Sequence, residues 1–430
     1  MERTIKIALV GAGMFGGDVH LRAYADLQRF GIAGQLARLG LDQHSRDFAD
    51  VKFELVAVAT RSQASAERVV AQFNSFTHHA SRITPPRPYS GETPWLDILR
   101  DFPELDALAV ATPDHLHTQP ILAALAQSVH VLTEKPLCLD IAEADQIIEL
   151  AQAKNRIVAV DMHKRYDPDH LRIRDDIQQR IGEPLYGTAY LEEPLEVSTS
   201  TFKWVESSDP FSYVGPHWVD LIWHYYHSKP VSLTAVGQKK RLVRDGINAY
   251  DAVQVRVDFA NGMSINFHNN WITPADFEGP VNQGHEIIGA DGKVESDQQY
   301  RGFRWWNAGG GSRTSNNHFT RDVKRADGSQ AYVGYGVDSL TAGLVAICRM
   351  KFLGATRDAV AEIYPTAEDA RIVVAIVHAA RLVRDLNFKY LSEGKGAPVT
   401  ARFGDDGITI VDPHSANEGK VFQRIYERAV

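Results

Sequence analysis

The stretch Ile5-Lys6-Ile7-Ala8-Leu9-Val10-Gly11-Ala12-Gly13-Met14-Phe15-Gly16-Gly17 is an apolar run that leads directly into a Gly-x-Gly-x-x-Gly motif. Such a run is typical of a strand buried on both faces. The first glycine allows a tight turn, the second lets a pyrophosphate approach the backbone, and the third lets the next helix pack closely. The N-terminus of that helix offers unpaired N–H groups to an anion. The stretch predicts a dinucleotide site formed by Gly11, Gly13, Met14, Phe15 and Gly16, although a glycine-rich turn in another α/β protein is the alternative.

The residues after the next predicted strand, 53–59, indicate which dinucleotide is favoured. An acidic residue there would accept hydrogen bonds from the ribose hydroxyls of NAD, whereas this chain has Thr60-Arg61-Ser62 and no acid. Arg61 can pair with a 2′-phosphate, and the two hydroxyls can donate to it. We therefore expect NADP(H) to be favoured, with NAD(H) possible. The alternative is that Arg61 is an ordinary exposed arginine.

Strands and helices alternate up to about residue 160, which predicts a parallel, doubly wound sheet. We interpret residues 27–50 as a partly helical insertion and residues 75–94, which contain four prolines, as a surface loop. Beyond Pro168 alternating strands such as 252–259 and 264–269 dominate, joined by the hairpin signal Ala260-Asn261-Gly262. The prediction is an α/β domain over 1–160, an α+β domain with a large, mostly antiparallel sheet over 161–395, and a C-terminal extension over 396–430. A long helix is expected from Thr366 to about Leu386.

Length and composition exclude several classes of protein. The 430 residues are too many for one ordinary core, and the net charge of −8 argues against a polyanionic partner such as DNA. No apolar run approaches the length of a membrane span, and the first residues leave no room for a signal peptide. Cys138 and Cys348 form no metal-ligand pattern, so we expect two idle thiols in a reducing compartment, the cytoplasm.

Three further stretches occur in the order seen in one family of dehydrogenases. They are Ala111-Thr112-Pro113-Asp114-His115-Leu116-His117, Glu134-Lys135-Pro136 and Gly215-Pro216-His217-Trp218-Val219-Asp220. Together with the glycine motif, the chain resembles the glucose–fructose oxidoreductase / inositol dehydrogenase (Gfo/Idh/MocA) family over about residues 5–225. Residues 287–292 and the helix from Thr366 also fit this family, whereas the part after about Lys395 is not covered.

The resemblance implies a Rossmann domain, a mostly antiparallel substrate domain, and hydride transfer between a sugar or polyol and a nicotinamide cofactor. It implies that Lys135 is the catalytic lysine and His217 the histidine of the cleft. Arg165 would face that cleft. The residues expected to line the dinucleotide are Thr112, Pro113, His117, Glu134 and Lys135. We also expect a homo-oligomer, a dimer or tetramer, assembled through the C-terminal sheet.

The chain departs from the family at one position. Many members carry an aspartate four residues before the histidine, where this chain has Tyr213. If the segment is helical, Tyr213 and His217 share one face, so the tyrosine can still be a catalytic or substrate contact. It carries no charge at neutral pH, which puts a proton relay through that carboxylate in doubt. Asp220, one turn after His217, could hold a second sugar hydroxyl, or it could be a solvent-exposed carboxylate.

Alcohol oxidation removes a hydride from carbon and a proton from oxygen, so it needs a base whose pKa lies near the working pH. Burial and a positively charged nicotinamide would both lower the pKa of Lys135, and His217 titrates near neutrality without help. Either group could be the base. The alternatives are a structural salt bridge from Lys135 to Glu134 and a histidine packed beside Trp218.

No metal is expected, because the spacings of Asp161, His163, His217, His224 and His227 match no standard zinc pattern. The aromatic run 300–306 could stack on a sugar ring or simply pack. The favoured hypothesis is an NAD(P)-dependent dehydrogenase or reductase acting on a sugar or polyol. The alternatives are an NAD-dependent glycosidase of the same family, a noncatalytic NADP(H)-binding sensor and a structural scaffold.

Overall fold

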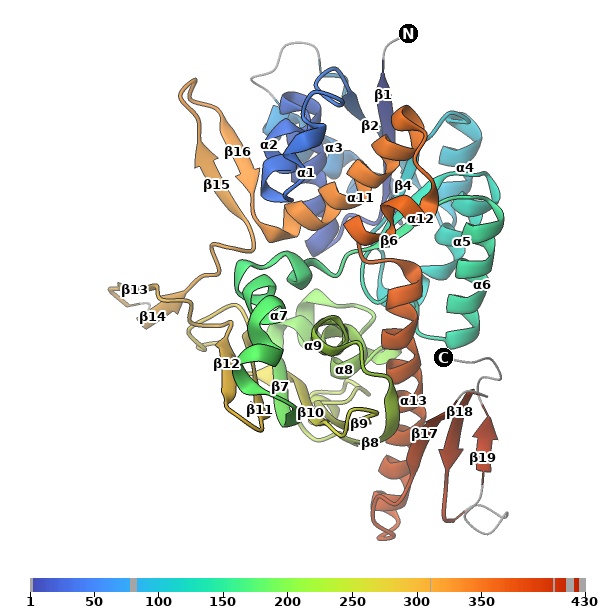
Figure 1. The fold of residues 1–430 in the computed structure, drawn as a ribbon, viewed down its shortest axis with the longest axis vertical. Helices are drawn as coiled ribbons and strands as arrows, with labels where there is room; N and C mark the ends of the chain where they lie inside the picture. The colour runs from blue at the N-terminus through green and yellow to red at the C-terminus, as the bar shows by residue number, and fades with distance from the viewer. Residues whose placement is uncertain (1–2, 78–82, 310, 405–406, 415–420, 425–430) are drawn as a thin grey trace. The chain divides into compact units, whose positions relative to one another are not determined.

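The computed structural model describes residues 3–77, 83–309, 311–404, 407–414 and 421–424. The chain forms two compact units, which Figure 1 shows with their helices and strands labelled. The first comprises Met1–Cys138, Glu143–Asp167 and Asn317–Ala370, and the second comprises Leu139–Ala142, Pro168–Asn316 and Arg371–Val430. The predicted boundary near residue 160 lies close to the change from the first unit to the second between Asp167 and Pro168. The return of Asn317–Ala370 to the first unit has no counterpart in the prediction.

The first unit contains a parallel sheet of six strands. Their order is β3 (Arg87–Ser90), β2 (Lys52–Thr60), β1 (Thr4–Val10), β4 (Ala107–Val110), β5 (His130–Thr133) and β6 (Val158–Val160). All residues of β4, β5 and β6 are buried, which explains their continuous apolar sequence. The chain order reverses between β1 and β4, and in doubly wound sheets the ligand crevice lies at the carboxyl ends of the strands beside that reversal. The parallel, doubly wound prediction is confirmed.

Residues 75–94 are not simply a loop, so that prediction is wrong in part. Helix α3 (Gln63–Thr77) extends into the segment, β3 lies within it, and α4 (Pro94–Asp101) begins at its last residue. The sequence conceals β3 because it is a half-exposed edge strand that contains Pro88. An edge strand tolerates a proline and needs no apolar alternation. Residues 78–82 lie outside the described residues.

Helices surround the sheet of the first unit. They are α1 (Leu21–Phe30), α2 (Ala33–Arg38), α3, α4, α5 (Thr118–Ala126), α6 (Ile141–Ala153), α11 (Tyr335–Leu353) and α12 (Arg357–Val360). Helix α2 and a 3-10 turn at Asp42–His44 make the insertion partly helical, as predicted. Helix α11 is buried along most of its length, and a Cβ added at Gly343 would lie 2.6 Å from Leu132 Cδ2. The returning segment therefore supplies part of the core of this unit.

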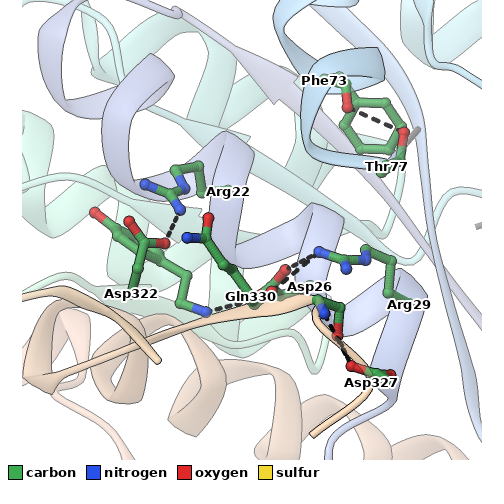
Figure 2. A network of polar contacts seen from close by, with 10 residues as sticks. Arg22, Asp26, Arg29, Phe73, Thr77, Asp322, Asp327 and Gln330 are labelled. Carbon is green, nitrogen blue, oxygen red and sulfur yellow. Dashed lines mark hydrogen bonds and ion pairs between the residues drawn. The ribbon is translucent and has the colours of Figure 1, made fainter. Parts of the chain in front are cut away.

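A polar network holds the returning segment to α1, the helix that continues from the glycine motif (Figure 2). The hairpin of β15 (Arg321–Lys324) and β16 (Gln330–Val333) lies on this helix, with an ion pair between Arg22 and Asp322. Arg29 Nη1 lies 3.1 Å from Asp26 Oδ1, and Asp26 Oδ2 accepts a hydrogen bond from the Tyr332 amide at 2.5 Å. Because Asp26 is buried, these two donors compensate its lost hydration.

The second unit contains a nine-stranded sheet. The order is β12 (Lys293–Asp297), β11 (Asn282–Gly289), β7 (Pro184–Pro194), β10 (Ser264–Thr273), β9 (Ala252–Phe259), β8 (Pro230–Gln238), β17 (Thr400–Gly404), β18 (Gly407–Val411) and β19 (Val421–Arg424). Only β7 and β10 pair in parallel among these neighbours in the described chain. The mostly antiparallel sheet is thus confirmed. The hairpin predicted at Asn261-Gly262 joins β9 to β10, with φ +83° at Gly262.

The remaining described elements of this unit are α7 (Pro168–Ile181), α8 (Pro210–Val214), α9 (Pro216–Tyr226), α10 (Arg241–Arg244), most of α13 (Ala367–Ser392), β13 (Arg304–Asn307) and β14 (Gly311–Thr314). Helix α13 runs six residues beyond its predicted end. The predicted extension is part of the sheet, because β17 pairs with β8. The buried Asn387 amide donates to the carbonyls of Ala235 and Val399, at 2.9 and 3.0 Å, and joins the extension to the helix.

Both cysteines are free and buried, as the sequence predicts. None of the helices in the described parts of the chain combines the length and apolarity of a membrane span.

Candidate active site

The glycine motif has the geometry of a dinucleotide loop. Gly11 has φ +87°, and a Cβ added there would lie 2.4 Å from Ala111 O. A Cβ at Gly16 would lie 2.5 Å from Gly11 O, whereas a Cβ at Gly13 would meet no atom within 4 Å. The fold itself therefore requires Gly11 and Gly16, while Gly13 leaves open space. The backbone is helical from Met14 onward, so its first amides point toward that space, and the loop fits a pyrophosphate.

The loop after β2 carries the residues expected at the adenosine ribose. Ser62 Oγ accepts a hydrogen bond from the Ser65 amide at 3.3 Å, just before α3 begins, and Thr60 Oγ1 donates to Ser62 O at 2.9 Å. Arg61 Nη2 lies 3.1 Å from Glu92 Oε1, and these two side chains are 85% and 82% exposed. An exposed pair of this kind is weak. Arg61 is thus available to a phosphate, in competition with an acid that the sequence reasoning did not identify.

Thr112, Pro113 and His117 follow β4, on the other side of the reversal in strand order. Thr112 Oγ1 is buried and, among the described residues, has no hydrogen-bond partner. His117 Nδ1 lies 2.7 Å from Pro136 O and His117 Nε2 lies 2.9 Å from Thr112 O. Burial lowers the pKa of His117, although both carbonyls oppose that shift. The ring therefore ties the loop after β4 to the loop after β5, and its contact with a dinucleotide stays a prediction.

Glu134 and Lys135 follow β5 and are 6% and 7% exposed. The Glu134 amide donates to Val110 O at 2.8 Å, which fixes this turn against the end of β4. The Glu134 carboxyl faces His20, with Oε1 2.8 Å from His20 Nε2. Lys135 thus lies in a buried turn at the carboxyl end of the parallel sheet. The glycine loop lies at the same end, after β1. This is the placement that an acid–base group beside a nicotinamide needs.

His20 is a residue of this site that the sequence reasoning missed, and Asp161 was considered there only as part of a metal pattern. Donor atoms of His20, Glu134 and Asp161 lie within 4.8 Å of one another, and all three side chains are buried. The 2.8 Å contact between His20 and Glu134 is an ordinary hydrogen bond, whereas neither Asp161 oxygen has a hydrogen-bond partner among the described residues. That no metal binds here stays a prediction. The sequence contained a signal for both residues as part of this site. His20 lies one helical turn after Gly16, and Asp161 follows β6 directly.

Arg165 lies in the 3-10 turn His163–Tyr166, after β6. Its Nη1 lies 3.2 Å from Asp369 Oδ2, in the first turn of α13 and within the same unit. The guanidinium is 11% exposed. The sequence did not indicate this ion pair, and a role for Arg165 toward a substrate stays a prediction.

The second unit supplies Tyr213, His217 and Asp220. Pro216 divides the predicted helix into α8 and α9, because it has no N–H to donate. Gly215 between them keeps helical dihedral angles, φ −56° and ψ −35°, and the Val219 amide donates to Gly215 O at 3.1 Å. Tyr213 belongs to α8, and its ring contacts Phe202 edge-on at a centroid distance of 4.8 Å. That Tyr213 and His217 share one helix face therefore stays a prediction. A catalytic role of Tyr213 stays a prediction.

His217 and Asp220 lie three residues apart on α9 and are 7% and 1% exposed. The interpretation of Asp220 as a solvent-exposed carboxylate is wrong. Trp218 Nε1 donates to Tyr190 O at 2.8 Å and fixes the helix to β7. This fixed helix therefore carries a buried carboxylate and a buried histidine. The pair suits the binding of a polyhydroxylated ligand, because both side chains can hydrogen-bond to hydroxyl groups.

Two family models match the chain. Residues 5–162 match the model described as oxidoreductase family, NAD-binding Rossmann fold, and residues 171–295 match the GFO/IDH/MocA C-terminal domain. The first match spans β1 to β6, with the glycine loop and Lys135. The second includes α8 and α9, which carry Tyr213, His217 and Asp220.

Curated relatives include the 1,5-anhydro-D-fructose reductase of Ensifer adhaerens, 25% identical over 45% of this chain and 57% of the reductase. The inositol 2-dehydrogenase of Acidothermus cellulolyticus is 25% identical over 68% of this chain and 73% of that enzyme. Among solved structures, scyllo-inositol dehydrogenase from Lactobacillus casei, with bound cofactor NAD(H) and scyllo-inositol, is similar with a TM-score of 0.61 and 16% identity. That match covers 90% of this chain and 98% of the other. At this identity the likeness shows the fold.

Proposed function

The chain belongs to the GFO/IDH/MocA oxidoreductase family, and on that premise we propose that it transfers a hydride between a sugar or polyol and NADP(H) or NAD(H). The observation that carries the proposal is in the first unit. Lys135, 7% exposed, stands at the carboxyl end of β5, in the same unit as a glycine loop whose Gly13 faces open space. A buried amine beside a dinucleotide site can act as the acid–base group that alcohol oxidation requires.

The nicotinamide, when bound, accepts or donates the hydride. The residues of the chain bind the cofactor, orient the substrate and exchange the proton of its hydroxyl group. Gly13 and the first amides of the helix from Met14 hold the pyrophosphate, and Thr112 Oγ1 is free to donate to the dinucleotide. Lys135 exchanges the hydroxyl proton of the substrate, and burial favours its neutral form. His217, in the second unit, is the other candidate for the base.

NADP(H) is the favoured cofactor in this proposal. Arg61 and the two hydroxyl residues around it follow β2 where the ribose binds, and no acid ends that strand. The opposing consideration is Glu92, because its carboxylate shares the Arg61 cation and would repel a 2′-phosphate. The preference between NADP(H) and NAD(H) thus depends on whether a 2′-phosphate displaces the Glu92 carboxylate from Arg61. The larger negative charge of the phosphate favours that displacement.

Sugars or cyclic polyols are the proposed substrates, since relatives named as inositol dehydrogenases and as an anhydrofructose reductase act on such molecules. We also propose a homo-oligomer assembled through the C-terminal sheet and a cytoplasmic location. Two free, buried thiols are consistent with a reducing compartment.

A panel of aldoses, polyols and their derivatives, followed at the absorbance band of the reduced nicotinamide, tests the proposal. The expected result is cofactor reduction with at least one compound. An NAD-dependent glycosidase would instead release an aglycone without net change in cofactor absorbance. A sensor would bind the cofactor and leave all compounds unchanged, and a scaffold would bind no dinucleotide.

A further inference from the structure

A buried row of polar side chains runs through the first unit and has no role in the chemistry described so far. Its members are Tyr24, His20, Glu134, Asp161 and His163, none of them more than 6% exposed. His20 Nδ1 lies 3.1 Å from the Tyr24 hydroxyl, and His20 Nε2 lies 2.8 Å from Glu134 Oε1. At the other end, His163 Nδ1 lies 3.7 Å from Asp161 Oδ2.

The centre of the row is a pair of buried carboxyl groups, Glu134 and Asp161, with an oxygen of each within 4.8 Å of the other. Two carboxylates buried this close together disfavour each other's ionisation, so one of the two is protonated. Burial raises the pKa of Glu134 well above its usual range, and the charge of Asp161 raises it further. Burial alone would also raise the pKa of Asp161, but the His163 ring 3.7 Å away and the Glu134 carboxyl lower it below its usual value. The shared proton therefore belongs to Glu134, and Asp161 is ionised.

The two histidines add no charge at neutral pH. Burial lowers the pKa of His20 to about 4 and also lowers that of His163. The His163 ring stacks on Phe15 at a centroid distance of 5.4 Å and packs against Phe319 and Tyr335. With both rings neutral and one proton on the carboxyl pair, the row carries a single negative charge.

That charge lies close to the proposed acid–base group. Lys135 follows Glu134 in the chain, and its ammonium lowers the pKa of both Glu134 and His163. Lys164 also acts on the row, because its charge lowers the pKa of His163. An electrostatic effect is mutual, so the anion on Asp161 must in turn stabilise the charged form of Lys135.

We propose that Glu134 and Asp161 hold one proton between them, and that Asp161 supplies the single negative charge that sets how tightly Lys135 holds its own proton. Both are positioning residues, because Glu134 carries the proton of the pair and Asp161 bears its charge. The second half of this proposal rests on the proposed function, in which Lys135 exchanges the substrate proton. The first half concerns the resting protein alone.

Infrared difference spectroscopy on the full chain tests the shared proton without turnover. The wild type at pH 7 is expected to show the carbonyl stretch of a buried, protonated carboxylic acid, and Glu134→Gln is expected to lose it. Glu67→Gln, which alters an exposed acid on α3, should keep the band. Glu134→Leu, equally neutral, replaces the amide variant if that one does not fold. A wild-type spectrum identical to that of the Glu134 variant would overturn the proposal, as would a stoichiometric metal ion that only the wild type retains.

The pH dependence of kcat/KM for substrate oxidation tests the charge. Asp161→Asn should move the acid limb to lower pH by about one unit, because the Lys135 ammonium loses its anionic neighbour. Glu134→Gln should keep the midpoint of that limb, whatever its turnover, because it removes no charge. Equal shifts in both variants, or none in Asp161→Asn, would overturn the charge assignment. If no substrate is oxidised, the infrared result still decides the shared proton, so the two failures remain distinguishable.

Discussion

At the residue scale, backbone geometry determines the glycine loop, whereas contacts between residues distant in the chain determine the surroundings of Lys135. Gly11, Gly13 and Gly16 have separate physical tasks in the structure, as the motif predicted. The side-chain partners were harder to predict from the sequence. His20 meets Glu134 across 114 residues, and Arg165 meets Asp369 across 204. No local pattern encodes such a pair, so the buried network behind Lys135 could not be predicted from spacing.

The cofactor preference gives a prediction at this scale. Arg61→Ala should weaken NADP⁺ binding by about tenfold or more, the usual scale for losing a charge-assisted hydrogen bond, and leave NAD⁺ binding nearly unchanged. Glu92→Gln should act in the opposite direction and strengthen NADP⁺ binding, because Arg61 then has no competing carboxylate. Titration of both dinucleotides into the three proteins provides the dissociation constants. Tighter binding of NAD⁺ than of NADP⁺ by the wild type would contradict the preference.

At the element scale, strand and helix types followed from apolar periodicity, and the errors arose where an element is short or exposed. Edge strand β3 has four residues, none of them buried, and so gave no signal. The break between α8 and α9 follows from Pro216, whose effect was underestimated beside a strong helical pattern. The junction of β1 with its helix is the element on which the dinucleotide site depends.

That junction allows two matched substitutions with opposite outcomes. Gly16→Ala should destabilise the protein by about 1–3 kcal/mol, because the new methyl group would lie 2.5 Å from a backbone oxygen that cannot move freely. Gly13→Ala should leave the free energy of unfolding unchanged but weaken dinucleotide binding, since its methyl group enters the space of the pyrophosphate. Urea unfolding and dinucleotide titration measure both quantities. Equal loss of stability in the two variants would refute this division of roles.

At the scale of the whole molecule, the two fold classes were predictable but the path of the chain was not. The segment Asn317–Ala370 returns to the first unit and contributes α11 to its core, because that helix is apolar on nearly all sides. An all-round apolar helix must be buried, but the sequence does not say in which unit. The extension likewise appeared separate, although β17 and β18 continue the large sheet.

Buried histidines make the stability of the molecule depend on pH. Burial lowers the pKa of His130 to about 3 and that of His20 to about 4, and His130 Nδ1 accepts a hydrogen bond from the Ile157 amide, which requires a neutral ring. The unfolded chain therefore binds more protons, so the stabilisation is complete above about pH 6.5 and is lost progressively as the pH falls toward 3–4.

We expect each of these histidines to contribute a fall on the order of 2 kcal/mol in the free energy of unfolding between pH 7.5 and pH 5. Glu134 acts in the opposite direction, because it is protonated in the folded protein and releases its proton on unfolding. Urea unfolding at a series of pH values measures this slope. His130→Asn keeps an acceptor for the Ile157 amide but cannot titrate. The change of its free energy of unfolding with pH should therefore be smaller, by the equivalent of up to about one bound proton. A His130→Asn slope equal to that of the wild type would show that the His130 ring is not held neutral.

The central claim is that Lys135 exchanges the substrate proton in an NAD(P)-dependent oxidation. The most direct measurement is kcat for the best compound of the panel, compared between the wild type and Lys135→Met, which keeps most of the apolar stem of the side chain. The account predicts a loss of at least about 100-fold with an unchanged unfolding transition. A folded variant with near-wild-type kcat would contradict it.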